Sequence, residues 1–336
     1  MERSKKRRIF FVTCGLLLPL LCLLSLRLGA KEMSFSEFFG ALLGAEGTEG
    51  ERLILYHVRA PRVLGGIVAG VGLSVSGALL QSVTGNDMAS PSLIGVNAGA
   101  GFAAILSLSF FSFHPLSLSL CAFLGAFLTT LFIVSLSLRL RMKQSAVILV
   151  GVAVSSLFSA GISFLSLLDD GVLSTYNAFS VGSLSGLSFS RLALPFAAVA
   201  FSFLLAFLLS GWIDLLSLGD GMAGYLGARI GALRTLAMLL ASLSAAAVVS
   251  FAGLLGFVGL MAPHIARRFT GGLLRRLLPG TALVGASLVV AADLVGRLLL
   301  APGELAVGIP MAFLGAPFFL ALLLLGRGGR ICDGEV

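Results

Sequence analysis

Long runs of apolar residues, separated by short polar stretches, follow one another along almost the whole chain. A helix that crosses about 30 Å of hydrocarbon needs roughly 20 residues of this kind. The sequence holds ten such runs, at about 9–28, 61–81, 92–111, 115–138, 145–167, 190–210, 233–252, 256–268, 279–298 and 306–325. The eighth run is short and rich in glycine, so its bounds are the least defined. The pattern predicts a polytopic membrane protein with ten transmembrane helices.

The runs are continuous, whereas strands of outer-membrane barrels alternate apolar and polar residues over about ten positions. In lipid every backbone amide must be bonded within its own segment or within a closed barrel, so runs of this length form helices. No linker, low-complexity tract or run of charges divides the chain. We therefore expect one all-α transmembrane domain that covers residues 1–336.

Composition agrees with this interpretation. Hydrophobic residues make up 58% of the chain and charged residues only 11%, whereas soluble domains contain about 25% charged residues. A water-soluble fold could not bury so much apolar surface, so the solvent around most of this chain must be lipid.

The net charge of +8 has a topological explanation. With the N-terminus in the cytoplasm, the polar stretches around residues 3–8, 139–143, 229–234, 267–276 and 327–330 all lie inside, and they hold most of the 23 Lys and Arg residues. This is the positive-inside rule. The pattern predicts a multi-pass protein of the cytoplasmic (inner) membrane, with both termini inside and no nucleic-acid partner. The first run is long for a signal peptide and no A-x-A site follows it, so we expect it to be retained.

Three polar segments are long enough to carry a function. Residues 29–60, outside, include an amphipathic stretch at 34–43 that suits the membrane surface. Residues 168–190 form a second outer segment. Residues 211–232, inside, are interrupted by glycines and read as two short helices with a flexible joint, which favours a docking element.

Signatures of catalysis are missing from the sequence. There is no G-x-x-x-x-G-K-[ST], no G-x-S-x-G and no H-E-x-x-H. The four cysteines form no C-x-x-C pair, so we expect no metal site, no cofactor and no enzymatic activity. Charges within the runs are also scarce. Asp293 and Arg297 are the main ones, and their spacing of four on one helix favours a local ion pair.

Several segments carry a recognisable pattern. Residues 59–100 read RAPRVLGGIVAGVGLSVSGALLQSVTGNDMASPSLIGVNAGA, and residues 253–268 read GLLGFVGLMAPHIARR. These segments, with 277–297 and 303–323, resemble the permeases for iron–siderophore, haem and cobalamin uptake, the type II ABC importers. The residues that match in the first segment are Arg59, Pro61, Arg62, Ser76, Gly77, Gln81, Asn86, Ala89, Pro91, Gly95, Gly99 and Ala100. Asp87 and Met88 depart from the usual Pro-Leu, and Phe179 stands where the family commonly has Trp.

The resemblance implies a type II ABC importer permease fold and a set of partners. A second copy or a sister permease would complete the pathway. Two cytoplasmic ATPase subunits would hydrolyse ATP, which this chain cannot do itself. An extracytoplasmic substrate-binding protein would deliver the cargo, and membrane lipid would surround the spans.

The resemblance also implies roles for particular residues. Arg59, Arg62 and Arg297 would pair with acidic residues of the binding protein, although snorkelling to lipid phosphates is an alternative. The coupling loop, about 212–230, would dock the ATPase through Leu218, Gly219, Asp220, Ala223, Leu226 and Gly227. Lys143, Gln144 and Ser145 match the position of the family's cytoplasmic gate. Ser76, Gly77, Gln81, Asn86, Pro91 and Gly95 belong to the pathway or to packing, and we expect Pro263 and His264 to be structural.

Three functions remain open from the sequence. The first is an ABC importer permease for a ferric siderophore or, with the same machinery, for cobalamin or haem. The second is an ion-coupled secondary transporter, which the scarcity of charge within the spans disfavours. The third is a membrane receptor or structural protein, which would not need the docking segment.

Overall fold

The computed structural model describes residues 2–29, 33–45, 47–110, 115–139, 144–227, 229–301 and 303–328. Within them the chain forms helices and connecting turns, and no strand. The α-helices are α1 (Glu2–Arg27), α2 (Phe35–Leu43), α3 (Glu49–Ile54), α4 (Ala60–Thr84), α5 (Val96–Phe110), α6 (Pro115–Arg139), α7 (Gln144–Ser166), α8 (Asp170–Val181), α9 (Phe189–Leu208), α10 (Ser210–Asp214), α11 (Asp220–Tyr225), α12 (Ile230–Ala252), α13 (Val258–Thr270), α14 (Leu274–Leu299) and α15 (Gly308–Gly328). Three short helices of other types join them: η1 (Leu55–Arg59), η2 (Pro91–Ile94) and η3 (Leu215–Leu218).

Each of the ten predicted spans lies on a helix. Seven helices of the described chain are long and apolar enough to cross a membrane: α1, α4 together with α3 and η1 before it, α6, α7, α9, α12 and α14. Two more, within α5 and α15, are apolar but shorter. The tenth, α13, has only 13 residues and is strongly one-sided, with arginines in its last turn. The all-α membrane fold is therefore confirmed.

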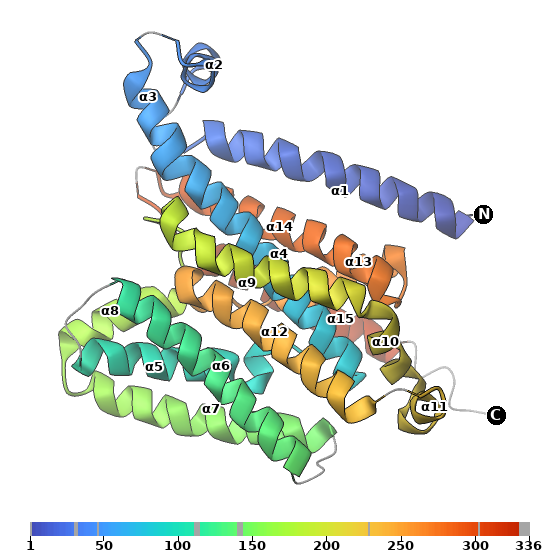
Figure 1. Ribbon diagram of the computed structural model, residues 1–336. Helices are drawn as coiled ribbons and strands as arrows, with labels where there is room; N and C mark the ends of the chain where they lie inside the picture. The colour runs from blue at the N-terminus through green and yellow to red at the C-terminus, as the bar shows by residue number, and fades with distance from the viewer. Residues whose placement is uncertain are drawn as a thin grey trace.

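Helix α4 lies at the centre of the bundle. It is packed along its length by α14, α12, α13 and α9, while α5, α6 and α7 form a second group that joins the first mainly through α12 (Figure 1). The buried share of the apolar windows reflects this arrangement, at 83% for α4 and 11% for α1. Helix α1 lies along the outside of α14 and presents most of its surface outward.

The short helices that connect the spans lie at the two ends of the bundle. Helices α2, α3 and α8 lie at one end, and the start of α1 lies at the other with α10 and α11 (Figure 1). Following the charge distribution, we call these the outer and inner ends. Helix α2 coincides with the amphipathic stretch predicted at 34–43. It begins with a capping box in which Ser34 and Glu37 each bond the other's backbone N–H.

Glycines on both helices permit a close contact between α4 and α14. A Cβ added at Gly70 of α4 would overlap the backbone of Gly285 and Ala286 in α14, and one at Gly285 would overlap the Gly70 carbonyl oxygen. Membrane helices associate largely through close packing, so small residues at such points set how near two backbones can come. These two glycines fix the spacing between α4 and α14.

Candidate functional site

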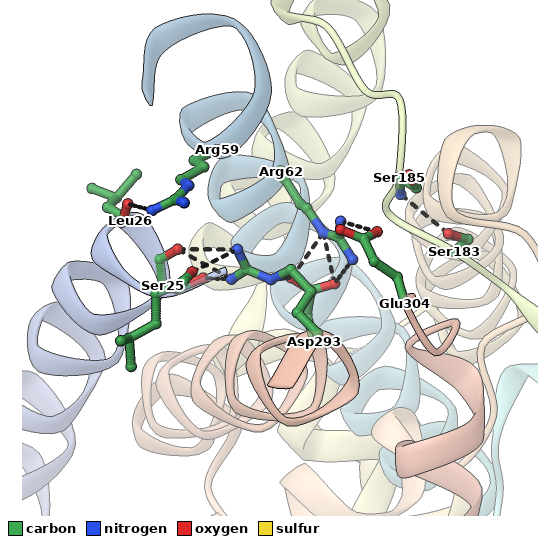
Figure 2. Close-up of polar contacts among 10 residues, drawn as sticks. Ser25, Leu26, Arg59, Arg62, Ser183, Ser185, Asp293 and Glu304 are labelled. Atoms are coloured by element: carbon green, nitrogen blue, oxygen red, sulfur yellow. Dashed lines mark hydrogen bonds and ion pairs between the residues drawn. The ribbon is translucent and has the colours of Figure 1, made fainter. Parts of the chain in front are cut away.

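A cluster of charged residues lies at the outer end, where α1 ends and α4 begins (Figure 2). Arg62, in the first turn of α4, donates from Nε to both carboxylate oxygens of Asp293 in α14, at 3.0 and 3.0 Å. Its Nη1 donates to Oε2 of Glu304 at 2.6 Å. The planar guanidinium can donate hydrogen bonds to two carboxylates at once. Arg62 therefore joins α4 to α14 and to the turn before α15.

Asp293 also pairs with Arg297 one turn later on the same helix, with Nε and Oδ2 3.2 Å apart. The ion pair predicted from their spacing is confirmed. Arg297 donates further, from Nη1 to the carbonyl oxygens of Ser25 at 3.1 Å and Leu28 at 3.2 Å. Its Nη2 bonds the Ser25 carbonyl oxygen and hydroxyl. One buried carboxylate thus lies between two guanidiniums.

The end of α1 explains why arginines gather here. The last carbonyls of a helix have no partner within it and carry partial negative charge. Arg59 donates from Nη1 to the carbonyl oxygens of Leu26, at 2.9 Å, and Arg27. Arg59 and Arg297 together cap the C-terminus of α1, so the cluster holds that helix against α4 and α14.

The three arginines lie close together, and all three are buried. Arg59, Arg62 and Arg297 expose 4%, 5% and 2% of their surface. In the described structure their guanidiniums bond acceptors of this same chain. The Glu304 side chain is the accessible member of the cluster, at 34% exposure.

The predicted coupling loop occupies the inner end and has the expected shape. Two short helices, α10 and α11, flank η3, and Gly219 forms the joint with a φ of 86°. Ala223 is fully buried, whereas Met222, Tyr225 and Leu226 expose 61%, 92% and 57% of their surface. Gly227 is exposed as well, and the side chains of Leu218 and Asp220 lie outside the described residues. The segment presents an apolar surface beyond the bundle.

This segment is attached to α14 by one carboxylate. The backbone N–H of Leu274, at the start of α14, donates to Asp214 Oδ1 at 2.9 Å and Oδ2 at 3.2 Å. The preceding residue, Leu273, supplies no side-chain cap, so Asp214 caps α14 from another segment. Burial raises the pKa of the Asp214 carboxyl above its usual value, and the hydrogen bond from Leu274 offsets part of this rise.

Two segments that carry the family pattern, in α4 and α13, pack against each other in the structure. Gly77 of α4 lies against Gly259 of α13 so closely that a Cβ on Gly77 would overlap the Gly259 carbonyl oxygen. One turn later Gln81 accepts a hydrogen bond from Arg267 Nη2 at 3.1 Å. Arg267 also pairs with Asp87, which stands where the family usually has Pro. This unusual residue thus fastens the turn after α4 to α13.

The other motif residues shape turns or fill the interior. Asn86 Oδ1 accepts from the N–H of Met88 at 2.9 Å, Pro91 begins η2, and Gly95 ends it with a φ of 74°. The hydroxyl of Ser76 is buried without a hydrogen-bond partner. Pro263 is buried within α13, and the His264 ring meets Phe318 edge-on with centroids 5.8 Å apart.

The side chains of the predicted cytoplasmic gate are not described by the structure. Lys143 is not described, and Gln144 and Ser145 begin α7 with side chains that are not described either.

Sequence reasoning missed three residues that the structure brings into these sites. Asp214, Glu304 and Asp87 each contact a residue far away in the chain. The signal available was weak: each is a carboxylate in a polar segment next to a span, within a chain that contains only 15 Asp and Glu residues.

Comparison with known proteins identifies a matching family and several relatives of this chain. The profile of the FecCD transport family matches residues 17–325. The vitamin B12 import system permease protein BtuC of Vibrio cholerae is 35% identical, over 96% of this chain and 96% of its own length. The Fe(3+)-citrate import system permease protein YfmE of Bacillus subtilis is 33% identical, over 96% of both chains. A solved structure described as an inward-facing conformation of a metal-chelate type ABC transporter superposes with a TM-score of 0.85 at 30% identity, covering 94% of this chain and 99% of its own.

Fold, motifs and relatives agree over nearly the full length. The chain belongs to the FecCD transport family, and its named relatives are permeases of import systems for Fe(3+)-citrate, vitamin B12 and hemin.

Proposed function

We propose that this permease carries a ferric siderophore across the cytoplasmic membrane and couples its passage to ATP hydrolysis on separate subunits. The observation that carries the coupling is the position of α14. Its 26 residues extend about 39 Å, from the Asp214 contact at the inner end to Asp293 and Arg297 at the outer end. One rigid element thus joins both proposed docking regions.

At the inner end, two ATPase subunits would dock on the segment 212–230, one on each permease copy. Exposed Met222, Tyr225 and Leu226 support this proposal, because an apolar surface on a polar cytoplasmic segment suits a protein partner. Leu218, Gly219, Asp220, Ala223 and Gly227 complete the segment.

At the outer end, a substrate-binding protein would dock over the charged cluster. Arg62 already bonds the part-exposed carboxylate of Glu304, and a guanidinium held in this way suits a carboxylate of an acidic partner. A partner carboxylate would enter at Glu304 and compete with it for Arg62. Arg59 and Arg297 would hold the end of α1 in place during that exchange.

The coupling itself would be mechanical. Closure of the ATPase dimer moves the α10–α11 segment, and the Asp214 contact passes that movement to α14. The close Gly70–Gly285 contact makes α4 follow. Packed helices shift against one another as rigid bodies in such transitions. The predicted gate at Lys143, Gln144 and Ser145 would open on the inner side.

The proposed cargo rests on the names of the relatives of this chain. Its relatives are named for Fe(3+)-citrate and vitamin B12 import, so a ferric siderophore is the first candidate and cobalamin or haem the alternative. The test is uptake into proteoliposomes that contain this permease, its ATPase and its binding protein. Each radiolabelled cargo is offered in turn, with ATP inside. ATP-dependent uptake of a ferric siderophore alone supports the proposal, and uptake of only cobalamin or haem replaces it.

A further inference from the structure

Helix α2, at the outer end, has three distinct faces. One is buried, because Phe38 and Ala41 cluster with Leu55 of η1 and Leu26 of α1. The second is apolar but exposed, and its side chains leave between 43% and 82% of their surface open: Phe35, Phe39, Leu42 and Leu43. The third is polar and holds Ser36, Glu37 and Gly40. With 3.6 residues per turn, the exposed apolar face and the polar face lie on opposite flanks of the buried one.

The neighbours of α2 show how these two flanks are oriented. The guanidinium of Arg27, in the last turn of α1, lies over the Phe35 ring, 3.4 Å from its centroid. The exposed apolar face therefore lies beside the end of a membrane span. Gly40, on the polar face, instead approaches the residue before α3, since a Cβ added at Gly40 would lie 3.0 Å from Cγ2 of Thr48.

The start of α3 projects beyond the membrane. Helices α3, η1 and α4 form one continuous stretch, Glu49–Thr84, of 36 residues. At 1.5 Å per residue it is about 54 Å long, whereas the hydrocarbon core is about 30 Å thick. Its first turns extend past the end of α1, beside α2 (Figure 1). The polar face of α2 is thus turned toward this projecting tip, and the apolar face toward the membrane.

The lipid-facing surface of α1 leads to the same point. Leu16, Leu20 and Leu23 each expose more than half of their surface. Arg27 follows Leu23 by four positions, so it lies on the same face of α1 as these leucines. Through Arg27 this face continues onto Phe35 and then along the exposed apolar face of α2. The two faces form one apolar surface, which follows a span and then turns onto the membrane surface.

We propose that α2 is an interfacial anchor, whose exposed apolar face enters the outer leaflet of the bilayer and contacts phospholipid acyl chains. Amphipathic helices in this position bury their apolar side about 5–10 Å into the boundary between headgroups and acyl chains. Arg27 then lies at the level of the headgroups, with its stem along apolar surface. A protein that approaches from outside meets the flank of Glu37 and Thr48 instead, so the orientation of α2 selects lipid as the occupant of the apolar face.

The test is fluorescence quenching of one tryptophan in the full-length permease, held in phosphatidylcholine nanodiscs that leave both membrane surfaces open to water. Trp212, the single tryptophan of the chain, is first replaced by Trp212→Phe. The test variant then carries Phe39→Trp. The matched control carries Glu49→Trp, at the exposed start of α3 in the same outer segment.

We expect the two variants to respond in opposite ways. Phosphatidylcholine brominated on its acyl chains should lower the fluorescence of the Phe39→Trp variant about twofold, because that side chain lies among those chains. The same lipid should leave the Glu49→Trp variant almost unchanged. Iodide in the surrounding water should quench the Glu49→Trp variant and spare the Phe39→Trp variant.

Three outcomes would overturn the proposal. Quenching of the Phe39→Trp variant by iodide and not by bromine would show that the face is open to water. Protection from both quenchers would mean that protein covers it. Equal bromine quenching of the two variants would contradict the orientation of α2. If the Phe39→Trp variant fails to fold, Leu43→Trp takes its place on the same face. The readout does not depend on transport, so it stands or falls separately from the proposed function.

Discussion

At the scale of single residues, the outer cluster depends on Asp293. Its carboxylate is 2% exposed and lies between the guanidiniums of Arg62 and Arg297. Removing one member of a buried ion pair leaves its partner without compensation, and this typically costs about 3–5 kcal/mol. We therefore expect Asp293→Asn to lower the free energy of unfolding by about 3 kcal/mol, measured by denaturant titration of the purified permease in detergent.

Glu304→Gln is the matched control, because it removes a carboxylate from the same Arg62 at a site that is one-third exposed. We expect a loss below about 1 kcal/mol, as for other ion pairs open to solvent. If both variants lost the same amount of stability, the cluster would not be organised around Asp293.

The residues of this cluster were only partly predictable. The pairing of Asp293 with Arg297 follows from their spacing on one helix, and the structure confirms it. The bond from Arg62 to Asp293 spans 231 positions in the sequence, and no local pattern encodes it. The burial of Arg59 and Arg297 also escaped prediction, because the carbonyls that they cap at the end of α1 are backbone atoms, which carry no sequence signal.

At the scale of elements, the contact between α4 and α14 provides a test of packing. Gly70→Val adds a Cβ where the backbone of Gly285 and Ala286 already lies, with two further methyl groups attached to it. Overpacking of this kind costs about 1–3 kcal/mol or more when backbone must move. We expect a clear fall in the melting temperature of the permease in detergent, followed by near-UV circular dichroism.

Gly15→Val is the control for that experiment. Gly15 lies in α1, and no atom lies within 4 Å of a Cβ added there. The melting temperature should stay close to that of the unaltered chain. A fall as large as that of Gly70→Val would show that valine itself destabilises these helices, irrespective of contact.

The contact between Asp214 and the start of α14 supports a second prediction. Asp214→Ala removes the cap, which typically costs about 1 kcal/mol, and under the proposed mechanism it also loosens the connection between the ATPase and α14. We expect ATP hydrolysis to continue in the reconstituted complex while cargo transported per ATP falls severalfold.

Asp214→Asn retains an oxygen acceptor for the Leu274 N–H and should recover much of the coupling. If the alanine variant transported as much cargo per ATP as the unaltered permease, the Asp214 contact would have no part in coupling.

Which helices exist could be predicted, but their contacts could not. The apolar runs place all ten spans on helices, because each run is long and bounded by polar residues. In a membrane, however, buried and lipid-facing surfaces are similarly apolar, so periodicity gives little information on which faces pack together. The central position of α4 and the peripheral position of α1 therefore appear only in the structure.

At the scale of the whole molecule, the proposed function requires the inner segment 212–230 to bind an ATPase subunit. Leu226→Asp places a charge on the exposed apolar surface of the segment without disturbing the bundle. We expect the permease to keep its melting temperature but to lose most of the ATPase that copurifies with it, because an unpaired charge at an interface core is costly.

Leu53→Asp is the counterpart at the other end. Leu53 is 60% exposed in α3, at the outer end of the bundle (Figure 1). ATPase copurification should be unchanged by it. Equal loss in both variants would mean that the added charge acts through the detergent or through folding, and Leu226 would then give no support to docking.

The central claim is that ATP hydrolysis on separate subunits drives a chelate through this permease. It is tested most directly by uptake of radiolabelled ferric siderophore into proteoliposomes that contain permease, ATPase and binding protein. The account predicts uptake that requires internal ATP and persists when ionophores abolish every ion gradient. Uptake that continues without ATP and stops with the ionophores would contradict the account.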